Sequence, residues 1–214
     1  MKEPNPNRRL FLLGAGGHGR VVADMAEVLG WRDIAFLDGL WPKLKRSLIW
    51  PVVGTFDDLP LAEASPCHVC ATMGNNRTRL AVHRKLVRTG FVAPSLIHPS
   101  AVVSPHASVG SGTVVMPNAV INAGAVIGDA VIVNTGATVD HDCQLGDGVH
   151  VSPGAHIAGE VVIGEASWIG IGAVVRETVS IGRGVTVGAG AAVIFHIADE
   201  QLVTGVPARR KTRD

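Results

Sequence analysis

An aliphatic residue recurs at every sixth position across nearly half of the chain. From Ile97, stepping by six, seventeen successive positions hold Ile, Val or Leu, ending at Val193 with no insertion. The position four residues further on is Ala or Val in thirteen of these repeats. A period of six fits neither a helix of 3.6 residues per turn nor an alternating strand, but it is typical of hexapeptide repeats that wind into a parallel β-helix. We therefore expect residues 97–197 to form such a β-helix.

The same repeat predicts a narrow interior. One aliphatic and one small side chain per side face inward, and Gly or Asn after the aliphatic residue forms the corners. Cys143 occupies the small-residue row, which favours an interior position over the role of a catalytic nucleophile. The small interior also accounts for the composition, because the 214 residues include only five Phe, four Trp and no Tyr.

Charge divides the chain into unlike parts. Residues 97–197 carry two basic and seven acidic residues, whereas the remainder carries 17 basic against 11 acidic residues. We predict a first domain of residues 1–96, the β-helix of residues 97–197, and a C-terminal tail of residues 198–214 with four basic residues: Arg209, Arg210, Lys211 and Arg213. The tail is either a solubilising extension or a contact for ligand phosphates.

The overall charge and hydropathy exclude several classes of protein. A net charge of +1 argues against a nucleic-acid-binding protein. No apolar run reaches the roughly 18 residues of a membrane span, and residues 1–9 lack the apolar stretch of a signal peptide. We expect a cytoplasmic protein that binds neither nucleic acid nor membrane. The charged fraction of 17% is low for a soluble domain and favours oligomerisation.

The first forty residues have the pattern of a nucleotide-binding unit. A strand pattern leads into a glycine turn, an amphipathic helix pattern and a second strand pattern, which together supply Gly14, Gly16, Gly17, His18 and Asp38. A glycine turn in this context lets the backbone approach a diphosphate at a helix N-terminus. About ninety residues supply only half of a doubly wound sheet, so we expect a mononucleotide or a nucleotide-sugar. The alternative is a docking domain whose glycines only make turns.

A third strand and helix follow in the first domain. The strand pattern of residues 68–73 leads into the turn residues Gly74, Asn75 and Asn76, and a helix pattern then runs to about residue 88. Cys67 and Cys70 have the spacing of a redox or metal site. The apolar residues around them favour a buried strand instead.

Asp140-His141-Asp142 is the strongest candidate for acid–base chemistry. A carboxylate beside a histidine orients the imidazole and raises its pKa toward neutrality. His150 lies nine residues on, half of an 18-residue coil, so it belongs at a different corner, and both histidines could line one cleft between subunits of an oligomer. The six histidines of the β-helix leave a Zn²⁺ site as an alternative, although no pair has a tight ligand spacing.

At these residues the chain resembles bacterial sugar acetyltransferases of the left-handed β-helix superfamily. The resemblance rests on residues 133–147, residues 150–155, the glycine turn and the terminal Gly205-Val206-Pro207-Ala208-Arg209, and it covers almost the whole chain. The group most similar N-acetylates the C4 amino group of nucleotide-linked 4-amino-4,6-dideoxy sugars and includes sialic acid O-acetyltransferase-like proteins. The resemblance implies acetyl-CoA as cosubstrate, no metal, and a homotrimer with active sites between subunits.

The resemblance also implies roles for individual residues. His141 matches the general base and Asp142 its acidic partner. Contacts to acetyl-CoA are implied for Asn134, His150, Gly159, Ile171, Ala189, Val206, Pro207 and Arg209, with Gly159 as a backbone donor to the developing oxyanion. Contacts to the nucleotide-sugar are implied for Gly14, Gly16, Gly17, His18, Asp38, Gly74, Asn75 and Asn76. The His-Asp-Cys triplet looks closest to the GDP-perosamine N-acetyltransferases.

Three functions follow as hypotheses. The first is an acetyl-CoA-dependent N-acetyltransferase for a nucleotide-linked 4-amino sugar, with GDP-perosamine favoured over a UDP-linked sugar, and with direct transfer assisted by His141. The second is a sugar O-acetyltransferase of the sialic acid type. The third is a metal-dependent hydratase resembling the γ-carbonic anhydrases.

Overall fold

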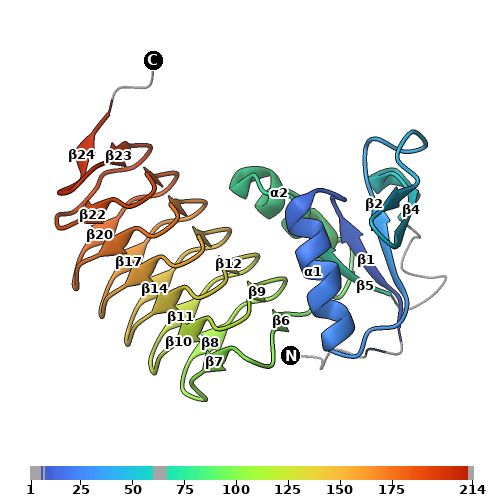
Figure 1. The fold of residues 1–214 in the computed structure, drawn as a ribbon, viewed down its shortest axis with the longest axis horizontal. Coiled ribbons are helices and arrows are strands. Elements are labelled where there is room, and N and C mark those ends of the chain that lie inside the picture. Colours follow the sequence, from blue (N-terminus) through green and yellow to red (C-terminus); the bar gives the residue numbers. More distant parts are fainter. Residues whose placement is uncertain (1–5, 7, 60–66, 212–214) are drawn as a thin grey trace. The chain divides into compact units, whose positions relative to one another are not determined.

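Two compact units, Met1–Leu96 and Ile97–Asp214, make up the chain (Figure 1). The computed structural model describes residue 6, residues 8–59 and residues 67–211. Arg213 of the basic tail therefore lies outside the described residues. Among the helices of the described residues, none is long and apolar enough to cross a membrane.

The first unit is a mostly parallel sheet with helices on its two faces. The sheet order is β3-β4-β2-β1-β5, in which only β3 runs antiparallel to its neighbour. The strands are β1 (Leu10–Leu13), β2 (Ile34–Leu37), β3 (Arg46–Ser47), β4 (Trp50–Gly54) and β5 (His68–Ala71). The helices are α1 (Gly17–Val28), the 3₁₀ turn η1 (Phe56–Asp58) and α2 (Asn76–Arg88).

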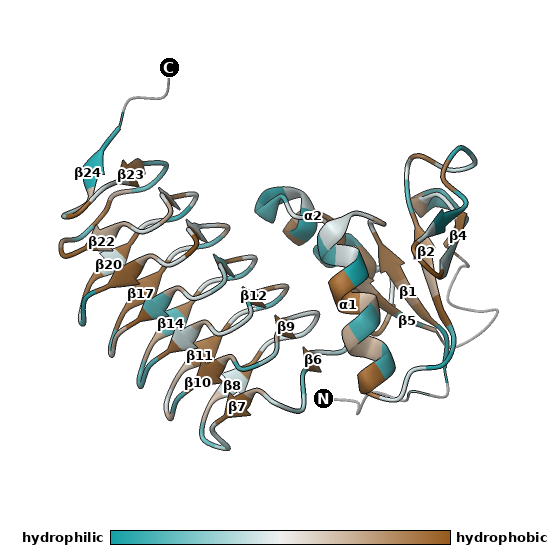
Figure 2. Cartoon of the chain, in the orientation of Figure 1, coloured by the Kyte–Doolittle hydropathy of each residue, from teal (hydrophilic) through white to brown (hydrophobic). Residues whose placement is uncertain are grey.

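Alternation along the strands explains why both faces of this sheet are covered. Phe11 and Leu13 pack with Leu86 of α2 on one face. On the other face, Phe36 lies next to the backbone of Gly19 in α1. β1 is accordingly coloured as hydrophobic in Figure 2, whereas α2 carries much hydrophilic surface. The hairpin of β3 and β4 was not predicted from the sequence and adds two strands beyond β2.

The second unit is a parallel β-solenoid, which confirms the prediction from the six-residue period. Its strands, which have two residues except for the three-residue β23, stack into three sheets. Sheet I contains β7 (Val102–Val103), β10 (Val120–Ile121), β13 (Thr138–Val139), β16 (His156–Ile157), β19 (Val174–Val175) and β22 (Ala192–Val193). Sheet II contains β8 (Ser108–Val109), β11 (Val126–Ile127), β14 (Gln144–Leu145), β17 (Val162–Ile163) and β20 (Ser180–Ile181).

Sheet III is the longest of the three. It contains β6 (Leu96–Ile97), β9 (Val114–Val115), β12 (Ile132–Val133), β15 (His150–Val151), β18 (Trp168–Ile169), β21 (Thr186–Val187), β23 (Leu202–Thr204) and β24 (Arg209–Arg210). The chain visits sheets I, II and III in turn, so each coil has a corner I/II, a corner II/III and a corner III/I. Residues eighteen apart therefore stack along the solenoid axis, as the pairing of Val120 with Thr138 shows.

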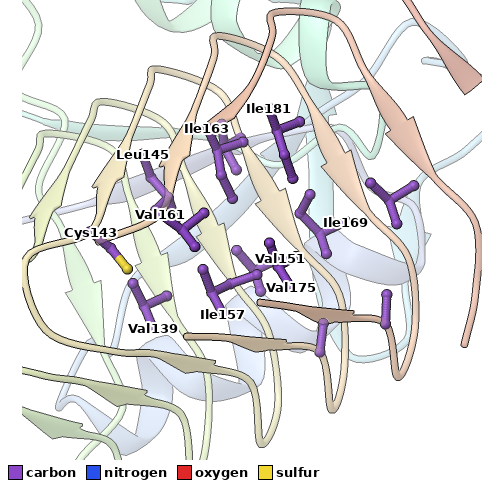
Figure 3. Packing of buried hydrophobic residues seen from close by; sticks show 14 of the residues in the cluster. Val139, Cys143, Leu145, Val151, Ile157, Val161, Ile163, Ile169, Val175 and Ile181 are labelled. Carbon is purple, nitrogen blue, oxygen red and sulfur yellow. The ribbon is translucent and has the colours of Figure 1, made fainter. Parts of the chain in front are cut away.

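The interior of the solenoid holds the two predicted rows of side chains. Figure 3 shows Val139, Leu145, Val161 and Cys143 pointing into it. Cys143 is fully buried, its thiol lies 3.1 Å from the carbonyl oxygen of Ala158, and burial raises the pKa of the thiol. Each buried Val or Ile contributes roughly 1.5–3 kcal/mol of hydrophobic stabilisation. Cys143 thus fills the core and is not placed to act as a nucleophile.

Candidate active site

His141 lies at corner I/II, in the turn between β13 and β14. Its Nδ1 is 2.9 Å from Oδ2 of Asp142, and its backbone N–H donates to Oδ1 of Asp140 at 2.8 Å. Asp140 is itself fixed by the side-chain amide of Asn122, 2.8 Å away. A carboxylate only accepts hydrogen bonds, so the proton of neutral His141 lies on Nδ1 and the lone pair lies on Nε2.

The electrostatics of this corner favour a basic imidazole. The hydrogen bond to Asp142 is the main cause that raises the pKa of His141, and the charges of Asp140, Asp142 and Glu160 add to it. Conversely, the hydrogen bonds from Asn122 and from the His141 N–H lower the pKa of Asp140. The side chain of His141 is about half exposed, with a relative accessibility of 54%. The ring is therefore reachable by a substrate.

Glycines in the neighbouring coils make room for this pair. Gly159 lies one coil above His141, and a Cβ there would stand 2.5 Å from His141 Nε2. Gly124 lies one coil below Asp142, and its Cβ would overlap Oδ1 of that carboxylate. Asp142 has a left-handed backbone, with φ of 57°, a conformation that Asp and Asn tolerate better than most residues. The hydrogen bond that Asp142 makes to His141 thus depends on small residues above and below it.

Apart from Gly159, the predicted acetyl-CoA residues form a second group, along sheet III and corner III/I. Asn134 follows β12, and its Nδ2 is 3.1 Å from Nε2 of His150 at the start of β15. Ile171 and Ala189 occupy the same corner in successive coils, which are tied by the hydrogen bond from the N–H of Gly190 to the carbonyl of Ile171 at 2.8 Å. These residues form a track parallel to the solenoid axis.

The track continues to the end of the solenoid. Val206 and Pro207 lie in the turn between β23 and β24, next to the exposed Arg209. Ile171 and Val206 are 60% and 76% exposed, so apolar surface stands open along the track. β24 is hydrophilic (Figure 2). The surface fits a ligand with an apolar arm and a phosphate-bearing end.

The two groups occupy different sides of the solenoid. His141, Asp142 and Gly159 lie at corner I/II, and sheet III, which carries His150, forms the opposite side. The structure thus brings His141 together with Gly159, and Asn134 together with His150, but it does not bring His141 to His150 within one chain.

In the first unit, the glycine turn lies beside the turn before α2. β1 pairs with β5, and each strand leads directly into one of these turns. The hydroxyl of Thr72 donates to the carbonyl oxygens of Leu13 and Gly14, at 3.0 and 2.8 Å, which ties the turns together. Gly14 has φ of 111° and needs a glycine backbone. The carboxyl ends of adjacent parallel strands are where ligands bind in such sheets.

The glycine turn itself is open where a ligand would approach. Gly16 and Gly17 are exposed, and a Cβ at either position would meet nothing within 4 Å. Gly19, by contrast, needs to be glycine because a Cβ would overlap the carbonyl oxygen of Gly14. His18, the second residue of α1, is mostly buried. Burial, with a contribution from the charge of Arg79, lowers its pKa to about 4, so His18 is neutral at physiological pH.

Asp38 has a structural role that the sequence did not predict. Its Oδ2 accepts from the N–H of Ala15 at 2.8 Å and its Oδ1 from the N–H of Leu40 at 2.9 Å. The carboxylate therefore holds the glycine turn against β2. Each oxygen keeps further acceptor capacity, so a ligand contact is compatible with these bonds.

The turn before α2 has two asparagines with different roles. Asn75 caps the helix, since its Oδ1 accepts from the N–H of Thr78 at 2.9 Å. Asn76 is buried and accepts from the Arg79 guanidinium at 3.0 Å. Arg79 is 1% exposed, and burial lowers its pKa to about 10. Sequence analysis missed this buried cation beside the turn, although a basic residue four positions after Asn75 on a helix was a visible signal.

The two cysteines of the C-x-x-C pair are both buried. Burial raises the pKa of both thiols, that of Cys70 to about 12, so neither is a reactive thiolate. Within the part of the chain that the structure describes, no three His, Cys, Asp or Glu residues gather as they would to hold a metal ion.

Known proteins combine the same two units in one chain. The family model described as the PglD N-terminal domain matches residues 9–86, and the bacterial transferase hexapeptide model, of six repeats, matches residues 124–159 and 160–194. The acetyltransferase domain of PglB from Neisseria gonorrhoeae is 47% identical, covers 96% of this chain and 100% of its own, and superposes with a TM-score of 0.90. This chain belongs to the hexapeptide-repeat nucleotide-sugar acetyltransferases. It is thus an acyltransferase, and its solenoid is the left-handed β-helix of that family.

Other solved members of this acetyltransferase family contain ligands. The same PglB domain is known in complex with acetyl coenzyme A, at 47% identity, 95% coverage of this chain, 99% of that chain and a TM-score of 0.89. PerB from Caulobacter crescentus, in complex with CoA and GDP-perosamine, is 40% identical, covers 95% of this chain and 97% of its own, and has a TM-score of 0.90.

Proposed function

We propose that the protein transfers the acetyl group of acetyl-CoA to the C4 amino group of a nucleotide-linked 4-amino-4,6-dideoxy sugar, with GDP-perosamine favoured and a UDP-linked sugar next. The observation that carries the proposal is the corner I/II pair, in which Asp142 holds Nδ1 of His141 and leaves Nε2 beside Gly159. The complex of PerB with CoA and GDP-perosamine supports the choice of ligands.

His141 is the general base in this proposal. When bound, acetyl-CoA supplies an activated thioester, so no covalent enzyme intermediate is required. Nε2 of His141 accepts the proton that the sugar amine loses as its nitrogen bonds to the acetyl carbon. Asp142 stabilises the imidazolium that forms. The C–S bond then breaks, and the CoA thiolate takes the proton from His141 as it leaves. The Gly159 N–H donates to the oxygen that develops negative charge.

The track along corner III/I is the proposed acetyl-CoA site. Asn134 and His150 lie at its inner end, Ile171 and Ala189 along the pantetheine arm, and Val206, Pro207 and Arg209 by the adenosine end. Strand spacing of roughly 4.8 Å puts about 19 Å between the coil of Asn134 and the turn at Val206, four coils further on. The exposed apolar side chains and the terminal arginines support this assignment.

The turns after β1 and β5 are the proposed nucleotide-sugar site. Gly14, Gly16 and Gly17 let the backbone approach the diphosphate at the N-terminus of α1. His18, Asp38, Gly74, Asn75 and Asn76 line the same edge of the sheet. The open glycines and the buried charge of Arg79 support an anionic ligand there.

A homotrimer with active sites between subunits completes the proposal. His141 and His150 lie on different sides of one solenoid, so both can reach one thioester only if they come from neighbouring subunits. We place the enzyme in the cytoplasm, where acetyl-CoA and nucleotide-sugars are available.

The test is an acetyl-CoA consumption assay with GDP-, UDP- and dTDP-linked 4-amino sugars and their 4-hydroxy counterparts. We expect turnover with a 4-amino sugar, N-acetylated product, and no dependence on added metal. Turnover only with hydroxy sugars would replace the proposal with an O-acetyltransferase, and carbon dioxide hydration with bound zinc would replace it with a metal-dependent hydratase.

A further inference from the structure

Trp168 stacks on the imidazole of His150. The pairing of β15 with β18 sets the two residues side by side on the outer face of sheet III. Their ring centroids are 5.7 Å apart and their planes differ by 3°. This is within the range of an offset aromatic stack. One face of the imidazole is therefore covered by the indole.

The indole is itself fixed to the coil that carries His150. Its Nε1–H donates to the hydroxyl of Ser152 at 2.6 Å. Ser152 is 1% exposed and lies two residues after His150. Trp168 thus contacts His150 through its face and is held at its edge by a hydrogen bond to Ser152.

Asn134 determines which nitrogen of His150 carries the proton. The backbone N–H of Thr135 donates to Oδ1 of Asn134 at 2.8 Å, which directs the amide NH₂ toward Nε2 of His150, 3.1 Å away. An amide NH₂ only donates, so Nε2 accepts. The neutral ring then carries its proton on Nδ1, and the lone pair of Nε2 is already engaged.

We propose that Trp168 is a positioning residue, which with Asn134 holds His150 as the neutral Nδ1–H tautomer. His150 then has no free lone pair and does not compete with His141, the proposed base, for the proton of the amine. Sequence analysis missed Trp168, which lies eighteen residues after His150 and therefore one coil above it. The inference rests on the proposed function in taking His141 as the base and His150 as a residue of the acetyl-CoA site.

The tautomer is measured by long-range ¹H–¹⁵N correlation spectra of the full chain labelled with ¹⁵N-histidine, near pH 7.5 and without substrate. The signals of His150 are assigned from their loss in His150→Gln. We expect a protonated Nδ1 and a bare Nε2. A ring protonated at Nε2, or at both nitrogens, overturns the proposal whatever any Trp168 variant does.

Two variants separate stacking from general packing. Trp168→Phe keeps an aromatic face, and we expect the wild-type tautomer and near wild-type kcat. Trp168→Leu removes the stack, and we expect mixed tautomers and a fall in kcat of about tenfold or less, the size of effect that one aromatic pair supplies. Val162→Ala changes an outward residue of the same coil on sheet II and serves as the matched control.

Several outcomes contradict the positioning role. A wild-type spectrum and kcat in Trp168→Leu would show that the stack does not matter, and an equal change in Val162→Ala would show that the effect is not specific. Because the tautomer is read without substrate, a chain that fails to acetylate any amino sugar would end the proposed function and leave this result standing.

Discussion

Two histidines on the outside of the solenoid, His141 and His150, have chemically different neighbours. His141 faces a carboxylate through Nδ1, with two more carboxylates close by, whereas His150 faces a side-chain amide through Nε2 and an indole on its face. The first environment stabilises an imidazolium, whereas in the second the side-chain amide NH₂ of Asn134 occupies the lone pair of Nε2. In the proposed mechanism, the same side chain therefore serves as a base at corner I/II and as a neutral, positioned ring on sheet III.

Replacing each of the two histidines in turn tests this comparison with the largest expected effect. In His141→Ala we expect kcat to fall by roughly 10²- to 10⁴-fold, the contribution of a positioned general base. In His150→Gln we expect a smaller loss, because that ring accepts no proton from the amine. Steady-state kinetics with acetyl-CoA and a 4-amino sugar give both values. A near wild-type kcat in His141→Ala would remove the base assignment.

Gly159 tests whether the fit around His141 matters as much as its chemistry. In Gly159→Ala the new methyl group overlaps the imidazole, so we expect the ring to be displaced and kcat to fall by about 10- to 100-fold. We expect the KM for acetyl-CoA to stay within about twofold, because Gly159 makes a single proposed contact at the acetyl end and the rest of the proposed acetyl-CoA site lies at corner III/I. Unchanged kcat in a folded Gly159→Ala protein would contradict the observed packing of the ring.

Replacing Asp38 tests whether the nucleotide-sugar and acetyl-CoA bind to different units. In Asp38→Ala the hydrogen bonds from the N–H groups of Ala15 and Leu40 are lost. We therefore expect the KM for the sugar to rise several-fold and the free energy of unfolding to fall by about 1–3 kcal/mol. Acetyl-CoA binding, followed by calorimetry, stays unchanged. An equal loss of both ligands would contradict separate sites.

The basic end of the proposed acetyl-CoA track has the smallest expected effect. Deleting residues 209–214 removes four basic residues: Arg209, Arg210, Lys211 and Arg213. We expect the truncated protein to bind acetyl-CoA a few-fold more weakly, and to bind an analogue without the 3′-phosphate with the same affinity as the full chain. The salt dependence of binding also becomes shallower. Equal acetyl-CoA affinity with and without these residues would assign the tail to solubility alone.

The solenoid could be predicted from the sequence because its inward-facing side chains recur at a fixed spacing. A side chain every six residues faces the interior, so the strands, the buried position of Cys143 and the stacking of Gly159 above His141 all follow from counting. The first unit lacks such a period. β3 has only two residues, and in β4 the exposed Pro51 and Val53 are as apolar as the buried Trp50 and Val52, so the sequence shows no polar–apolar alternation.

The sequence predicted which residues belong to the candidate site better than it predicted the contacts between them. The spacing of eighteen could have paired Trp168 with His150, yet whether two outward side chains touch depends on their rotamers and on partners such as Ser152. For the same reason the double role of Asp38 was invisible, because backbone N–H groups leave no trace in the sequence. Residue types indicate the chemistry, and hydrogen-bond geometry decides which nitrogen performs it.

The pH dependence of kcat in the wild type and in Asp142→Asn tests the base assignment most directly. His141 acts only when neutral, so activity falls as the pH drops through its raised pKa. Asn keeps the left-handed backbone but removes the charge, which lowers the pKa of His141. We predict that the acidic limb of the profile moves to lower pH in Asp142→Asn and that kcat at its plateau falls, since the remaining base is weaker. An acidic limb at the same pH in both proteins would contradict the account.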